Sequence, residues 1–318
     1  MIEIENLTKY YGERKAVGPL SCSIQDGEIV GLLGLNGAGK TTTLRVLACD
    51  LLPSSGTVRV DGLDVVDRPH EVRGRIGYLP DTPPLYGEMT VREYLAFVAR
   101  LRGLSRGDVD ARVRDAIDVT ELGRRADDVI ASLSHGYKQR VGIAQAIVHG
   151  PRLLVLDEPI TGLDPKQIVE MRKLLRSLGG KHTIVLSSHI LSEISETCDR
   201  ILVIADGRIA DAGTEAELQA KLAGARRVVF TVRGDGDEAA AVLEGVDGVS
   251  RVERLDPSEP GERVATLAID ATSDVREAAC AALIGAGLGL LEVRAERELE
   301  SVFLRLAAGA PDGAAEAA

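Results

Sequence analysis

Short apolar runs alternate with helical stretches over the first 222 residues of the chain. Runs that read as buried strands lie at 29–33, 153–156, 183–186 and 201–204. Continuous apolar runs of this length are typical of parallel strands that are buried on both faces. After the first of them a helix is predicted from Thr41 to Leu52, because Pro53 cannot continue it. The pattern therefore predicts an α/β fold.

Two further segments of helical periodicity, Val91 to Leu101 and Val109 to Ile117, lie between the predicted strands. Their apolar residues recur at helical spacing. They predict a helical insert of about 60 residues between strands, which is longer than an ordinary connection.

The pattern changes after residue 222. Strands are predicted at 227–232, 249–255, 263–270 and 288–293, and helices at 238–243, 275–284 and 299–306. The two middle strands form a hairpin across a loop at 256–261. The order β-α-β-β-α-β plus a helix predicts a small α+β, ferredoxin-like domain over 223–309. Residues 310–318 are Ala, Gly, Pro and acidic residues, and we predict that this tail is disordered.

Composition is that of a soluble globular protein, with 45% hydrophobic and 27% charged residues. The longest apolar run, Ala278 to Leu291, is shorter than the roughly 20 residues that a membrane-spanning helix needs. The N-terminus lacks a basic region, so no signal peptide is expected. The 4 cysteines form no CxxC pair, which fits a reducing cytoplasm and argues against a disulfide framework or zinc site.

Net charge is −11, and most of it lies in the C-terminal part. From residue 223 onward there are 10 Arg, no Lys and 18 acidic residues, which contribute −8. An acidic domain is repelled by phosphate backbones. The charge therefore argues against nucleic acid as a partner.

A glycine-rich motif follows the first predicted strand. Gly34-Leu35-Asn36-Gly37-Ala38-Gly39-Lys40-Thr41, with Thr42 after it, matches the P-loop pattern between a buried strand and a helix. The glycines let backbone N–H groups surround the phosphates of ATP, and the helix N-terminus adds its dipole. Lys40 supplies a positive charge, and the Thr41 hydroxyl is a candidate ligand of Mg²⁺. The alternative is a structural glycine-rich turn before an ordinary helix.

A second motif is an acidic pair, Asp157 and Glu158, which directly follows the predicted strand at 153–156. Asp157 is a candidate to hold Mg²⁺ through water, as acids at this position do in P-loop ATPases. Glu158 is a candidate to polarise the attacking water. An acidic pair at a strand end is often only a solvated turn, but it follows a P-loop here.

Three more segments carry a resemblance to a known family. Residues 132–140, Ser-Leu-Ser-His-Gly-Tyr-Lys-Gln-Arg, resemble the LSGGQ signature of ABC ATPases. Residues 159–165 resemble the D-loop of that family, and His189 resembles its switch histidine. The resemblance covers about residues 1–222. It implies an ABC cassette, with a RecA-like core, an antiparallel β subdomain and a helical insert.

The resemblance also implies roles for single residues. Ser134 and Gly136 would contact the γ-phosphate of ATP bound to a second subunit, so that two copies close head-to-tail as a homodimer. Asp164, in the D-loop, would take part in nucleotide binding. His189 would contact the γ-phosphate and help to orient water. Tyr11 would stack on adenine, with Tyr10 as the alternative.

The chain departs from the family pattern at three positions. Asp81 stands where the family usually has a glutamine that reaches Mg²⁺, and an aspartate there adds a negative charge near phosphate. Both a metal-ligand role and no such role stay open for Asp81. The signature carries His135 in place of glycine and Tyr137 in place of glutamine. We expect ATP hydrolysis to survive these changes at a reduced rate.

Residues 83–95 resemble the ATP-hydrolysing subunits of ABC-2 type exporters for drugs, lipids or sodium, or of gliding machinery. The resemblance implies a separate membrane permease as partner and a location on the cytoplasmic face of the membrane. Two alternatives are a soluble ABC ATPase that acts on translation or DNA, and a weakly hydrolysing regulatory module. The sequence indicates no transported substrate.

Overall fold

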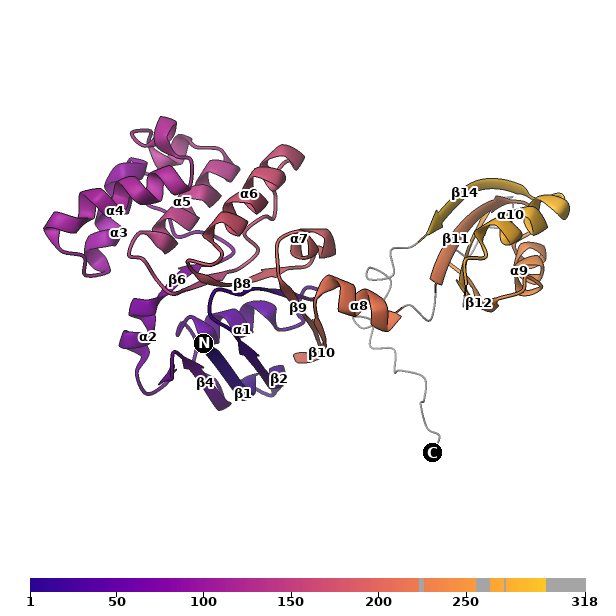
Figure 1. Ribbon diagram of the computed structural model, residues 1–318, viewed down its shortest axis with the longest axis horizontal. Coiled ribbons are helices and arrows are strands. Elements are labelled where there is room, and N and C mark those ends of the chain that lie inside the picture. The colour runs from indigo at the N-terminus through magenta and orange to yellow at the C-terminus, as the bar shows by residue number, and fades with distance from the viewer. Residues whose placement is uncertain (223–225, 256–263, 272, 296–318) are drawn as a thin grey trace. The chain divides into compact units, whose positions relative to one another are not determined.

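The computed structural model describes the chain except at residues 223–225, 256–263, 272 and 296–318. The chain forms two compact units, Met1–Glu215 and Ala216–Ala318 (Figure 1). The division falls at the start of helix α8 (Glu215–Leu222). The pattern of apolar residues placed the boundary seven residues later, at the end of that helix.

A six-stranded sheet forms the centre of the first unit. Its order is β10-β9-β3-β8-β7-β6, and its strands are β3 (Ile29–Leu33), β6 (Ile76–Leu79), β7 (Leu153–Leu156), β8 (Thr183–Ser188), β9 (Arg200–Ala205) and β10 (Arg208–Gly213). Strands β9, β3, β8, β7 and β6 are parallel, and β10 pairs antiparallel with β9. All four apolar runs predicted as strands lie in this sheet, because parallel strands are buried on both faces.

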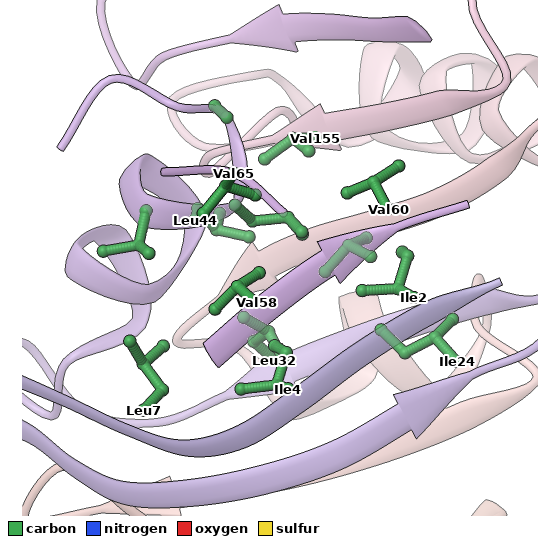
Figure 2. Packing of buried hydrophobic residues seen from close by; sticks show 14 of the residues in the cluster. Ile2, Ile4, Leu7, Ile24, Leu32, Leu44, Val58, Val60, Val65 and Val155 are labelled. Atoms are coloured by element: carbon green, nitrogen blue, oxygen red, sulfur yellow. The ribbon is translucent and has the colours of Figure 1, made fainter. Parts of the chain in front are cut away.

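A second, antiparallel sheet covers one side of this core. Its order is β2-β1-β4-β5, with β1 (Ile2–Tyr11), β2 (Arg14–Ile24), β4 (Ser55–Val60) and β5 (Leu63–Asp64). Figure 2 shows Ile2, Ile4 and Val58 from this sheet among the same buried side chains as Leu32 and Val155 of the parallel sheet. These apolar contacts join the two sheets, since burial of apolar surface is the main stabilising term in folding.

The helices of the first unit are α1 (Lys40–Leu47), α2 (Pro69–Arg75), α3 (Val91–Leu101), α4 (Arg106–Val119), α5 (His135–Ile147), α6 (Pro165–Leu178) and α7 (Leu191–Ser195). Helix α1 ends five residues earlier than predicted, and Cys49 just beyond it has a left-handed φ of 57°. Helix α3 begins with a capping box between Thr90 and Glu93. In the described part of the chain no helix has the length and apolar character to cross a bilayer.

Gly77 in β6 lies against the backbone of helix α5. A Cβ atom at this position would lie 2.1 Å from the carbonyl oxygen of Ala146. We therefore expect Gly77→Ala to lower the free energy of unfolding by about 1–3 kcal/mol, because the helix backbone must shift. Gly74→Ala is the matched control, since a Cβ at Gly74 meets nothing within 4 Å in the described part of the chain and alanine favours helix α2. Chemical denaturation of both variants measures the difference, and equal stabilities would contradict the close contact.

The second unit has a ferredoxin-like order of elements. Its strands are β11 (Arg226–Arg233), β12 (Val249–Arg254), β13 (Val264–Ala271) and β14 (Gly289–Ala295), and its helices are α9 (Gly236–Glu244) and α10 (Arg276–Gly285). The antiparallel sheet has the order β12-β13-β11-β14, and alternate residues such as Val228, Phe230 and Val232 are buried with apolar residues of both helices. The predicted helix at 299–306, the loop at 256–261 and the tail at 310–318 lie outside the described residues.

Candidate nucleotide-binding and catalytic site

The glycine-rich loop joins β3 to the N-terminus of α1, as the motif predicted. Gly37 and Gly39 have left-handed φ angles of 85° and 105°. A Cβ atom on Gly39 would lie 2.7 Å from the carbonyl oxygen of Ala16, so a glycine is needed there on two grounds. A loop of this kind before a helix N-terminus directs backbone N–H groups toward an anion.

The Lys40 side chain folds back over this loop. Only 5% of Lys40 is exposed, and its ammonium group donates to the carbonyl oxygen of Gly34 at 2.7 Å. The same nitrogen lies 3.4 Å from Oε1 of Glu158. The positive charge is therefore held at the loop and close to the proposed catalytic carboxylate.

Asp157 directly follows β7 and is 1% exposed. Its Oδ1 accepts hydrogen bonds from Ser187 at 2.6 Å and from Thr41 at 3.2 Å, whereas its buried Oδ2 has no partner among the described residues. Burial raises the pKa of Asp157; the two hydroxyl groups oppose that shift, and the charges of Glu158 and Asp81 add to it.

These residues fit Mg²⁺. A carboxylate oxygen without a partner in the part of the chain that the structure describes and the nearby Thr41 hydroxyl are both hard oxygen donors. A bound cation would offset the free-energy cost of burying the negative charge of Asp157. The described residues contain no group of three or more His, Cys, Asp or Glu that could hold a metal ion. The protein here would supply only a few ligands, as Mg²⁺ sites that are completed by water and substrate phosphates do.

Glu158 directly follows Asp157 and has a left-handed φ of 48°. Its backbone N–H donates to the Ser187 hydroxyl at 2.9 Å. Its Oε2 accepts a hydrogen bond from the Thr161 hydroxyl at 2.8 Å and lies 3.0 Å from Nδ1 of His189. A carboxylate held in this way beside a histidine can take a proton from a water molecule.

One cavity of about 530 Å³ contains most of the predicted residues. It is lined by Tyr11, Arg14, Ala16, Leu35, Asn36, Gly37, Gly39, Lys40, Thr41, Thr42, Asp81, Glu158, Thr161 and His189. Tyr11 is 46% exposed, and Lys9 lies 5.6 Å from the centre of its ring. Tyr10 does not line this cavity. Asp81 faces the same space as the P-loop, so the geometry leaves its metal role open.

Of the predicted signature and D-loop residues, Ser134, Gly136 and Asp164 do not line this cavity. Ser134 is the N-cap residue of α5 but makes no capping hydrogen bond with its side chain, whereas the Asp164 side chain caps α6 by accepting the N–H of Gln167 at 2.9 Å. Gly136 and Asp164 line a second cavity of about 370 Å³. Gly136 is buried, and a Cβ atom added there would lie 2.5 Å from the Gln167 side chain. One subunit therefore does not bring these residues to its own P-loop.

Sequence reasoning missed three residues that the fold brings to the site. Ser187 binds the Asp157 carboxylate and the Glu158 backbone, and Thr161 binds the Glu158 carboxylate. Arg14, at the start of β2, lines the cavity beside the P-loop. Thr161 stands in the D-loop segment three residues after Glu158, and Ser187 stands two residues before His189, so closeness to these motifs was the available signal.

The fold and this site define a P-loop ATPase of the ABC-cassette class. The family model described as "ABC transporter" matches residues 17–161. The chain is 40% identical to a bacitracin transport ATP-binding protein of Enterococcus faecalis over 77% of this chain and 78% of that protein. It is 35% identical to the Nod factor export ATP-binding protein I of Burkholderia orbicola over 96% of both chains. An ATP-binding cassette in a dimeric post-hydrolysis state with ADP and Pi is similar at a TM-score of 0.62 and 26% identity, over 67% of this chain and 98% of that one.

The chain therefore belongs to the ABC transporter family. It is an ATP-binding and ATP-hydrolysing subunit of such a transporter, as the motifs implied. The predicted fold class is confirmed for the cassette.

Proposed function

We propose that this subunit binds ATP with Mg²⁺ at the P-loop cavity, uses Glu158 and His189 in hydrolysis, and drives export through a separate membrane permease. The main support is the convergence of the P-loop, Asp157, Glu158 and His189 around one site. Export is supported by the relative that shares 96% of its length with this chain, because that protein is named for Nod factor export. In this proposal residues 1–222 are the cassette and 223–309 a separate domain.

The proposed working unit is a homodimer. Ser134, Gly136 and Asp164 lie away from the P-loop of their own subunit, so they can reach nucleotide only on a second copy. The N-terminus of α5 suits a phosphate group, because its first N–H groups have no partner within the helix. The dimeric cassette with ADP and Pi supports this arrangement by similarity.

The proposed permease contact is the surface around residues 81–87. A cavity of about 430 Å³ lies between this segment and the start of α5, and it is lined by Asp81, Thr82, Pro83, Leu85, Gly87, Ile130, Ala131, His135, Lys138 and Gln139. Beside it Tyr86 is 50% exposed, with its ring 5.5 Å from that of Phe97. An apolar surface with an exposed aromatic residue suits a short helix of a membrane protein. The subunit would then lie on the inner face of the cell membrane.

Co-purification tests this proposal. Extraction of the full chain in mild detergent is expected to recover a protein with several membrane spans, identified by mass spectrometry. Tyr86→Asp is expected to lose that protein while the isolated subunit keeps its ATPase rate, because Tyr86 does not line the nucleotide cavity. Recovery of ribosomes or DNA in place of a membrane protein would refute the proposal.

A further inference from the structure

His135 stands where the family signature has glycine, and its side chain makes a specific contact. Its Nε2 lies 3.1 Å from the carbonyl oxygen of Thr161. A carbonyl oxygen only accepts, so the histidine must donate from Nε2. His135 is the first residue of α5, and Thr161 lies in the loop between β7 and α6. The contact therefore ties the signature helix to the loop that begins at the catalytic carboxylate.

The loop after Glu158 has a glycine and a tight turn beside the His135 ring. Gly162 has a left-handed φ of 77°, and a Cβ atom there would lie 3.2 Å from Nε2 of His135. The Thr161 N–H donates to the carbonyl oxygen of Glu158 at 3.2 Å, which closes a tight turn. The imidazole, the glycine and the turn together restrict where the Thr161 side chain can lie.

The Thr161 side chain in turn contacts the Glu158 carboxylate. Its hydroxyl donates at 2.8 Å to Oε2, the same oxygen that lies 3.0 Å from Nδ1 of His189. The other oxygen, Oε1, lies 3.4 Å from Nζ of Lys40. Thr161 is thus one of three groups that orient this carboxylate, and it is the one that is connected to the signature helix.

We propose that Thr161 is a positioning residue for Glu158 and that His135 acts through Thr161. The inference rests on the proposed function, in which Glu158 is the general base and the start of α5 contacts nucleotide on the second subunit. A displacement of the signature turn by that nucleotide would move the Thr161 carbonyl, and with it the hydroxyl that holds Glu158. Nucleotide at one site would then affect the catalytic carboxylate of the other site.

Four variants of the full chain test this inference. Thr161→Val is expected to lower kcat about 10-fold with little change in KM for ATP, because a misplaced base slows the reaction and not binding. Thr161→Ser keeps the hydroxyl and is expected to restore kcat. His135→Gly is expected to lower kcat roughly 3-fold, as for loss of one exposed hydrogen bond. His135→Gln keeps an N–H donor and is expected to retain activity.

The double variant His135→Gly with Thr161→Val separates the proposed chain of contacts from two unrelated effects. If His135 acts through Thr161, the double variant has the kcat of Thr161→Val alone. Full additivity of the two losses, or a wild-type kcat for Thr161→Val, would overturn the inference. Glu158→Gln, measured in the same assay, distinguishes failure of the proposed function from failure of this inference. A fully active Glu158→Gln removes the proposed function, whereas an inactive one beside an unimpaired Thr161→Val removes only this inference.

Discussion

Glu158→Gln is expected to lower the rate of ATP hydrolysis by about 100-fold or more while ATP still binds. Glutamine keeps the shape of the side chain and its contact with Thr161, but it cannot accept a proton from water. The P-loop and its contacts with Lys40 remain, since Lys40 also donates to the carbonyl oxygens of Gly34 and Leu35. Loss of hydrolysis with retained binding is therefore the specific result that a general base predicts.

Two measurements check this prediction on the purified full chain. Phosphate release gives the rate, and size-exclusion chromatography with ATP shows whether the variant accumulates as a dimer. Glu71→Gln is the matched control, because Glu71 is an exposed residue of α2 that pairs with Arg68. A Glu158→Gln protein that hydrolyses ATP at the control rate would show that another group activates the water.

Lys40→Met is expected to weaken ATP binding by about 10- to 100-fold and to remove measurable hydrolysis. Methionine replaces most of the aliphatic stem of Lys40, whose side chain is 6% exposed, but it lacks the charge. A hydrogen bond to a charged group contributes about 1.5–3 kcal/mol, and each 1.4 kcal/mol is a factor of ten in the dissociation constant. Glu158 also loses its neighbouring cation, at 3.4 Å, so the carboxylate would repel the phosphates more strongly.

Isothermal titration with ATP measures the loss of affinity, and circular dichroism shows whether the fold persists. Lys173→Met, at an exposed position of α6, is the control for removal of one positive charge. Unchanged affinity in Lys40→Met would mean that the main-chain N–H groups of the loop hold the phosphates alone.

Several strands of this fold could be predicted from local sequence patterns. Buried parallel strands need continuous apolar residues, so β3, β7, β8 and β9 could be predicted from short runs alone. The end of α1 could not, because a proline at position 53 shows only where a helix cannot continue. The left-handed residue Cys49, two residues after the last residue of the helix, gives no signal of its own in the sequence.

The sequence by itself determined the chemical groups of the site. The phosphate-binding loop and the acidic pair are each contiguous in the chain, so their residue types and spacing can be recognised without a structure. Only the tertiary structure decided which groups touch. Thr41 and Asp157 are 116 residues apart, His135 and Thr161 are 26 apart, and Asp157 and Ser187 are 30 apart. Contacts at such separations depend on how strands and helices are arranged in space. Hydrogen bonds form only at about 3 Å, a distance that residue order does not contain.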